Sequence, residues 1–102
     1  MTSIISTYTK HIEIQNFSNR DVYIYKGKKH RAGDFPAEIW EDGAMRWYRH
    51  GKLHRDNGPA AIYANGTQVW YKDGKRHRDN DKPAAIYANG IEQYWINGER
   101  VR

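Results

Sequence analysis

The chain has 102 residues, a formal net charge of +5 and no cysteine. This length suits one domain with a single core and is too short for two ordinary domains. The missing cysteines exclude disulfides and thiolate metal sites, and the charge favours an acidic partner such as nucleic acid, an anionic membrane or an acidic protein surface.

The N-terminal part of the chain contains two short segments with the composition of β-strands, 11–15 (HIEIQ) and 22–25 (VYIY). They carry no basic region followed by a long apolar run, and no stretch of the chain approaches the length of a membrane span. We expect residues 1–24 to form strands that cap one end of the fold.

Three copies of one motif follow, and they begin at Gly27, Gly51 and Gly74. Each copy has His-Arg, Pro-Ala, Ile and Gly at nearly fixed intervals, with equivalent residues 23 or 24 positions apart. A fixed period of this length is typical of architectures in which each repeat stacks on the next. We therefore expect a single domain with capping strands over 1–24, three repeats over 25–98 and a tail over 99–102.

Pairs of Asn-Gly or Asp-Gly punctuate the repeats at 42–43, 65–66, 73–74, 89–90 and 97–98. Between Ile, Val, Trp and Tyr, such pairs indicate two-residue type I′ hairpin turns. In the second repeat they predict strands over 60–64, 67–72 and 75–78, and they leave no window for a helix. The predicted fold is all-β, an antiparallel meander of stacked β-hairpin repeats that forms a short solenoid.

A two-residue turn at 65–66 would set Ile62 opposite Val69 and so assign residues to the two faces of the sheet. The predicted interior face holds Ala37, Ile39, Tyr48, Ala60, Ile62, Tyr71, Ala84, Ile86 and Trp95. The opposite face holds Trp40, Trp47, Tyr63, Trp70, Tyr87 and Tyr94, edged by Arg49 and Lys72. This aromatic stripe is either a second packed face or a binding surface, since large aromatics serve both roles.

The repeated histidines are predicted to be structural. Counting about the turns at 26–27, 50–51 and 73–74 gives three aromatic–His pairs across the strands: Tyr23 with His30, Trp47 with His54, and Trp70 with His77. Equivalent histidines would lie on the order of 10 Å apart, whereas ligands of one Zn²⁺ lie about 2 Å from it. We therefore expect no metal and no cofactor, with pH-sensitive interaction or acid–base chemistry as the alternatives.

The carboxylates Asp34, Asp56 and Asp79 recur with the repeat, which favours Asx-turns over catalysis. Serine occurs only at Ser3, Ser6 and Ser18, and no glycine-rich phosphate loop precedes a helix. The chain is predicted not to be an enzyme, and a low-turnover enzyme is the third and weakest alternative for its function.

Residues 25–98 resemble the MORN-like repeats of small proteins from bacteriophages and large DNA viruses. The resemblance rests on the Gly, His-Arg, Pro-Ala, Ile-Tyr, Asn-Gly and Trp-Tyr positions of the repeat GKLHRDNGPAAIYANGTQVWYKDG. The resemblance implies stacked β-hairpins and non-catalytic work such as scaffolding or dimerisation. The chain departs from the eukaryotic pattern, because His-Arg-Asp-x-Gly-Pro-Ala stands where a tighter Gly-x-Gly run is usual. Lipid binding is therefore not expected.

The predicted function is a protein-binding module, a phage or viral accessory protein that binds and could inhibit a host protein such as a CRISPR-type defence complex. Trp47 and Trp70 are expected to be structural. The predicted partner-binding residues are Trp40, Tyr94, Arg49, Lys72, Tyr63 and Tyr87.

The alternative is a nucleic-acid-binding protein that uses basic edges and an aromatic face. We expect the partner to present an acidic protein surface and expect no membrane partner. The expected location is the host cytoplasm, and the chain could form a homodimer through an open sheet edge.

Overall fold

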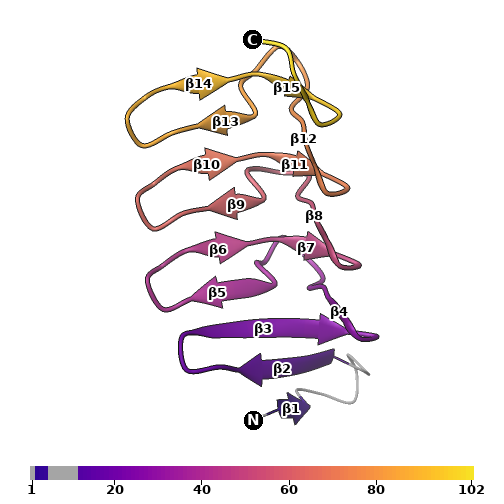
Figure 1. The fold of residues 1–102 in the computed structure, drawn as a ribbon. Coiled ribbons are helices and arrows are strands. Elements are labelled where there is room, and N and C mark those ends of the chain that lie inside the picture. The colour runs from indigo at the N-terminus through magenta and orange to yellow at the C-terminus, as the bar shows by residue number, and fades with distance from the viewer. Residues whose placement is uncertain (1, 5–11) are drawn as a thin grey trace.

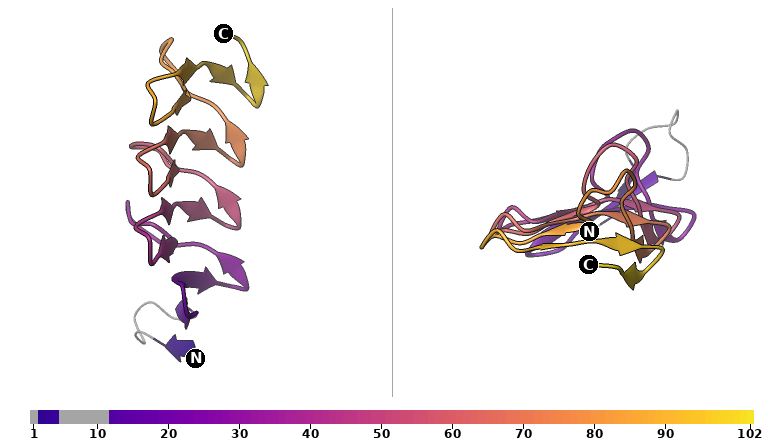
Figure 2. Two further views of the ribbon diagram at one scale, coloured as in Figure 1. Left: turned by 60° about the vertical axis from the view of Figure 1, so that its left-hand side comes forward. Right: turned by 90° about the horizontal axis from the view of Figure 1, so that it is seen from above.

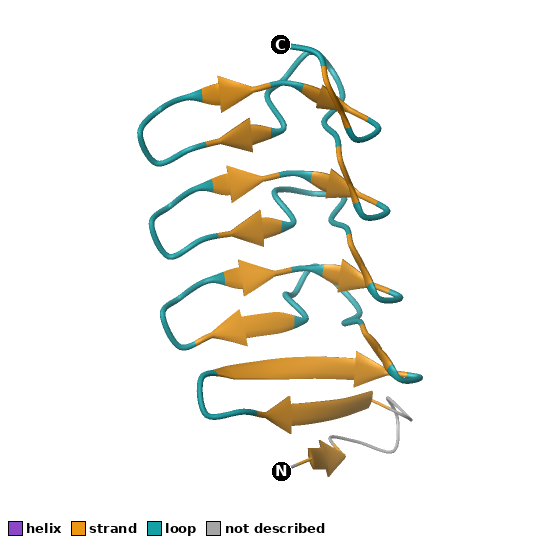
Figure 3. Cartoon of the chain, viewed as in Figure 1, coloured by secondary structure: helices purple, strands orange, loops and turns teal. Residues whose placement is uncertain are grey.

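The computed structural model describes residues 2–4 and 12–102, and this part of the chain is all-β, without a helix. Its strands are stacked along the long axis of an elongated molecule with extents of 45 × 25 × 17 Å (Figures 1 and 3). The strands are β1 (Thr2–Ile4), β2 (Ile12–Asn16), β3 (Arg20–Tyr25), β4 (Lys28–Lys29), β5 (Glu38–Trp40), β6 (Met45–Arg46), β7 (Tyr48–Arg49), β8 (Lys52–Leu53), β9 (Ala61–Ile62), β10 (Gln68–Val69), β11 (Tyr71–Lys72), β12 (Lys75–Arg76), β13 (Ala85–Ile86), β14 (Glu92–Gln93), β15 (Trp95–Ile96) and β16 (Glu99–Arg100). The cap predicted over 1–24 lies partly outside the described residues.

One antiparallel sheet runs the length of the molecule in the order β1-β2-β3-β5-β6-β9-β10-β13-β14, with β4 paired to β3. The sheet is open, because the order ends at β1 and β14 instead of closing on itself. Its register aligns one residue from each strand after β2 in a single row, namely Val22, Glu38, Arg46, Ala61, Val69, Ala85 and Gln93. Directly opposed residues share a face, so this row lies on one side of the sheet.

A second column is formed by the hairpins β7–β8, β11–β12 and β15–β16. In each repeat the chain leaves the sheet at an aromatic residue. Trp70, for example, donates its N–H to the carbonyl of Ala84 in the sheet, at 2.7 Å, and accepts the N–H of His77 in the hairpin, at 3.2 Å. The strand predicted over 67–72 is therefore two strands, β10 and β11, because Trp70 changes partners between them.

The hairpin tips have the predicted two-residue turns. Asp73 has a φ of 48° and Gly74 a φ of 84°, and positive φ at both central residues defines type I′. The same geometry recurs at 26–27, 50–51 and 97–98. The tips at 50–51, 73–74 and 97–98 each contact the preceding hairpin. The N–H of Gly74, for example, donates to the carbonyl of Leu53 at 2.8 Å.

The turns within the sheet differ from the prediction. At Asn65-Gly66, the N–H of Gly66 donates to Tyr63, the N–H of Tyr63 donates to Thr67, and only Gly66 has a positive φ, of 91°. This is a three-residue loop, a type I turn followed by a bulge. The side-chain oxygen of Asn65 accepts the N–H of Thr67 at 2.9 Å and so favours this loop over type I′. The turns at 42–43 and 89–90 repeat it.

The longer loop shifts the register by one residue, so that Ala61, and not Ile62, lies opposite Val69. A shift of one residue moves a whole strand to the other face, and both predicted faces are therefore wrong. One face holds Ala37, Ile39, Trp47, Ala60, Ile62, Trp70, Ala84, Ile86 and Tyr94. The other holds Trp40, Tyr48, Tyr63, Tyr71, Tyr87 and Trp95, beside the row that contains Ala61 and Val69.

The loops that join each hairpin to the next repeat all rise on one side of the sheet (Figure 2, right). We call this side, with Trp47 and Trp70, the loop face, and the opposite side the open face. On the loop face, aromatic residues alternate with Ala37, Ala60 and Ala84, which are fully buried. Trp47 is only 6% exposed, and Trp70 is half-buried.

Candidate functional site

The arginine of each His-Arg pair lies on an aromatic ring of the loop face. The guanidinium-to-ring distances are 3.8 Å for Arg31 on Tyr23, 3.8 Å for Arg55 on Trp47 and 3.9 Å for Arg78 on Trp70. At the C-terminal end Arg102, which follows Val101 instead of a histidine, lies 4.0 Å from the Tyr94 ring in the same way. Arg55 also donates to the carbonyl of Pro59 at 3.1 Å, and its equivalents do the same at Pro36 and Pro83. The arginine therefore fastens each loop onto the sheet through a cation–π contact and a hydrogen bond.

The predicted aromatic–His register is present, since the N–H of His54 donates to the carbonyl of Trp47 at 3.0 Å, and His30 and His77 are placed alike opposite Tyr23 and Trp70. The ring faces of Tyr23, Trp47 and Trp70, however, are occupied by arginine. The histidine rings contact the tip of the next hairpin instead. Nδ1 of His30, His54 and His77 accepts a backbone N–H from His50, Asp73 and Asn97, respectively, each at 3.0 Å.

A carboxylate faces the second nitrogen of two of these histidines. Nε2 of His54 lies 2.8 Å from Asp56, and Nε2 of His77 lies 2.8 Å from Asp79. Because Nδ1 is an acceptor, a neutral ring carries its proton on Nε2 and donates it to the aspartate. This hydrogen bond lowers the pKa of both carboxyl groups below 3.8.

The Asx-turn role predicted for Asp34, Asp56 and Asp79 is therefore wrong. Asp34 accepts two hydrogen bonds from Arg55 of the next repeat, at 2.8 and 3.2 Å, and these lower its pKa. The Asx contacts are made by Asp42, Asn65 and Asn89 within the sheet turns. The recurrent carboxylates bind side chains instead, which connects the repeats or orients a histidine.

The open face is lined by two rows of aromatic side chains, Trp40, Tyr63 and Tyr87 in one row and Tyr48, Tyr71 and Trp95 in the other. Between the rows lie small residues, of which Ala61, Val69 and Ala85 are at most 1% exposed. Tyr63, Tyr71 and Tyr87 pack against these three. Among the described residues, tyrosine rings and not a second layer of chain cover this part of the sheet (Figure 2).

Basic side chains are interleaved with the aromatic rows. Arg46 lies 5.8 Å from the Trp40 ring and 5.3 Å from the Tyr63 ring. Lys29 lies 5.0 Å from Tyr48, and Arg76 lies 5.1 Å from Trp95. Cations at these distances interact favourably with the rings and limit their freedom.

One buried carboxylate holds the N-terminal part of the open face. Glu38 is 2% exposed and contacts Lys29 at 3.0 Å, Arg46 at 3.3 Å and Arg20 at 3.4 Å. Burial raises the pKa of Glu38, but the hydrogen bonds from Lys29 and Arg46 outweigh it, and the pKa lies below its ordinary value. Glu38 and Arg46 stand where the second repeat has Ala61 and Val69.

The six predicted partner-binding residues do not form one site. Trp40, Tyr63 and Tyr87 lie together on the open face. Tyr94 lies on the loop face under Arg102. Arg49 and Lys72 are exposed on β7 and β11, and Arg49 is paired with Asp56 at 3.3 Å.

Sequence reasoning missed the row Tyr48, Tyr71 and Trp95, which it had placed in the interior. The sequence does contain a feature that allows the observed register. An Asn or Asp before the glycine of a sheet turn can form a three-residue loop as well as a type I′ turn.

In the described ranges 2–4 and 12–102, His, Asp and Glu side chains do not gather in groups of three that could hold a metal ion. The same residues contain no helix long and apolar enough to cross a membrane. Comparisons with protein-family models, curated proteins and solved structures found no match to this chain.

Proposed function

We propose that this chain is a non-catalytic protein-binding module of the MORN-like repeat type that binds its partner through the open face. The observation that carries the proposal is the pair of aromatic rows with interleaved arginines on a sheet face that no other segment of the described chain covers. Tyr, Trp and Arg are the residues that contribute most to binding at protein interfaces. Packing on Ala61, Val69 and Ala85 orders the rings before binding, which reduces the entropy lost on association.

The charge of the open face favours an acidic partner surface. Arg20, Lys29, Arg46 and Arg76 contribute four positive charges, and the buried Glu38 is already paired with three of them. The resemblance to phage and viral repeat proteins supports a partner in the host cytoplasm, such as a defence complex. The strands β1, β2 and β3 would then cap the array.

The proposal is tested by capture of a partner from host lysate, with identification by mass spectrometry. The open-face variant is Tyr63→Ser/Tyr87→Ser, and the matched control is the loop-face substitution Tyr94→Ser. We expect wild type and control to capture the same protein, and the open-face variant to bind it at least about 2 kcal/mol more weakly. Equal capture by all three folded proteins would reject the open face as the binding site.

A second candidate, nucleic-acid binding, is favoured by one observation. Lys28, Lys52 and Lys75 are exposed at successive hairpins, where each lies against the turn glycine of the next hairpin, at Gly51, Gly74 and Gly98. Such a row could contact successive phosphates, and the affinity for a single strand would then fall with salt at a log-log slope of about −0.7 per contact. Micromolar binding with that slope at physiological salt would favour this candidate over the first.

A further inference from the structure

The first repeat lacks a group that the other two repeats supply. In the second and third repeats, Nε2 of the histidine faces an aspartate two residues later in the chain, at 2.8 Å. In the first repeat the position two residues after His30 is Ala32. Nδ1 of His30 still accepts a backbone N–H, from His50 at 3.0 Å, so its neutral ring also carries the proton on Nε2.

No acceptor lies within hydrogen-bond distance of this Nε2 among the described residues. The ring itself is held in place, because its centroid lies 4.3 Å from that of His50 in a stacked arrangement and 5.4 Å from that of Tyr25. His30 is therefore an oriented donor that has no acceptor among residues 2–4 and 12–102.

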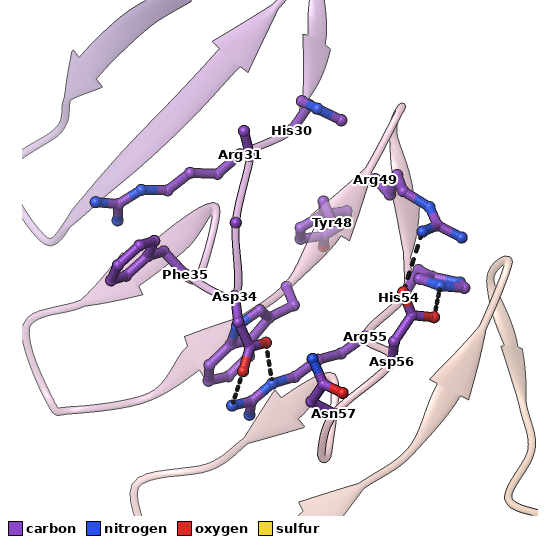
Figure 4. Close-up of a pocket in the computed structure, with 13 residues that line it drawn as sticks. His30, Arg31, Asp34, Phe35, Tyr48, Arg49, His54, Arg55, Asp56 and Asn57 are labelled. Atoms are coloured by element: carbon purple, nitrogen blue, oxygen red, sulfur yellow. Dashed lines mark hydrogen bonds and ion pairs between the residues drawn. The ribbon is translucent and has the colours of Figure 1, made fainter.

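A cavity opens beside this donor, between the first and second His-Arg loops (Figure 4). Its volume is about 400 Å³, whereas the equivalent hollow between the second and third loops measures about 160 Å³. Phe35, which is 59% exposed, and Arg31 line one side, while Arg49 and His54 line the other. The cavity is large enough for a side chain, with an aromatic ring available at its mouth.

The charges around the cavity suit one monoanion. Three arginines line it, Arg31, Arg49 and Arg55, together with two carboxylates, Asp34 and Asp56. Both carboxylates are already paired, Asp34 with Arg55 and Asp56 with His54 and Arg49. Burial lowers the pKa of His30, and so do the neighbouring His50 and Arg49.

We propose that this cavity binds a carboxylate supplied by another molecule, an acidic side chain of a protein partner, which accepts the Nε2–H of His30 in the way that Asp56 and Asp79 accept those of His54 and His77. This rests on the proposed function and extends it, because it gives the partner a second contact on the loop side of the molecule. A phosphate dianion fits less well, since Asp34 and Asp56 would repel its second charge.

The test is an NMR titration of the ¹⁵N-labelled imidazole rings with a tetraglutamate peptide and, separately, with inorganic phosphate. We expect the peptide to shift Nε2 of His30 to saturation, to shift Nε2 of His54 less, because it lines the cavity but is already bonded to Asp56, and to leave His77, outside the cavity, unchanged. No saturable shift at His30, or equal shifts at all three histidines, would overturn the proposal. Tighter binding of phosphate than of the peptide would overturn the carboxylate assignment.

The variant Ala32→Asp restores the His-Arg-Asp pattern within the first repeat and should fill the site from within. Its His30 Nε2 signal should move towards that of His54, and its affinity for the peptide should fall by about tenfold or more, the effect of losing one charge-assisted hydrogen bond. The control Ala64→Asp adds the same charge at an exposed sheet turn and should bind as wild type does. Undiminished binding by a folded Ala32→Asp variant would contradict the site.

The two proposals can fail separately. If His30 responds to the peptide but no partner is captured through the open face, the proposed function is wrong and the carboxylate site remains. If capture depends on Tyr63 and Tyr87 but His30 gives no response, only the carboxylate site is wrong.

Discussion

Nδ1 of His54, which follows β8, accepts the backbone N–H of Asp73 at the tip of the next hairpin, β11–β12, at 3.0 Å. This contact joins a His-Arg loop to the tip of the following hairpin, and it recurs between His30 and His50 and between His77 and Asn97. The histidine recurs in the sequence because each copy links two neighbouring hairpins.

Replacement of His54 by Ala should therefore destabilise the fold. The N–H of Asp73 and the carboxylate of Asp56 would both lose a partner, and His54 is only 6% exposed, so we expect a loss of about 1–3 kcal/mol in the free energy of unfolding. Urea denaturation measures it. The control is His50→Asn, at an exposed turn position with a φ of 50° that Asn tolerates. A loss no larger than that of the control would contradict the linking role.

The two faces of the sheet should respond differently to loss of an aromatic ring. Trp47→Ala on the loop face should cost about 3–5 kcal/mol, as large-to-small changes in a core do. Tyr63→Ala on the half-buried open face should cost clearly less. Thermal and urea unfolding of both variants check this, and Trp47→Phe gives a smaller loss in the same direction if Trp47→Ala does not fold. Equal losses at Trp47 and Tyr63 would mean that the open face is a second core.

The ion pair of Glu38 and Arg46 should be replaceable by an apolar pair, because Ala61 and Val69 occupy the same positions in the second repeat. Glu38→Ala alone should cost about 2 kcal/mol or more, because Arg46 loses a buried partner. The double variant Glu38→Ala/Arg46→Val reproduces Ala61 and Val69 and should recover to within about 1 kcal/mol of wild type. A double-mutant cycle in urea measures the coupling. Strictly additive losses would show that the two repeats are not equivalent in packing.

Stability should fall in two steps as the pH is lowered. The pKa of His30 is below 6.5 in the folded chain, so below about pH 6.5 the unfolded chain binds the proton first and folding weakens until the pH reaches the folded pKa. Asp56 and Asp79 have folded pKa values below 3.8, so their contribution is present above pH 3.8 and is lost as the pH falls through those values.

Urea midpoints measured between pH 8 and pH 3 would show these two steps. His30→Gln should reduce the upper step and leave the lower one. An upper step of unchanged size in His30→Gln would assign it to other groups.

Much of the backbone follows from local sequence signals. The turn residues act within four positions of one another. They explain the type I′ turns at Asp73-Gly74 and its equivalents, the 23- or 24-residue period, and the all-β structure of the described residues. The register that places His54 opposite Trp47 follows from the same turns.

Which face each side chain occupies was decided by the tertiary structure. Asn65-Gly66 has the same letters as a type I′ turn, but Thr67 bonds both the side chain of Asn65 and the backbone of Tyr63, and Ala88 of the next repeat donates to the hydroxyl of Thr67. The same three-residue loop forms at 42–43 and 89–90, where Ala44 and Ile91 replace Thr67. The register of the loop agrees with the pairing between repeats, in which Arg46 lies opposite Ala61 and Val69 lies opposite Ala85, and this register moves Tyr71 to the open face. The placement of the proton on Nε2 of His30 likewise depends on the neighbouring hairpin, because Nδ1 becomes an acceptor only when the hairpin tip at His50 donates its backbone N–H to it.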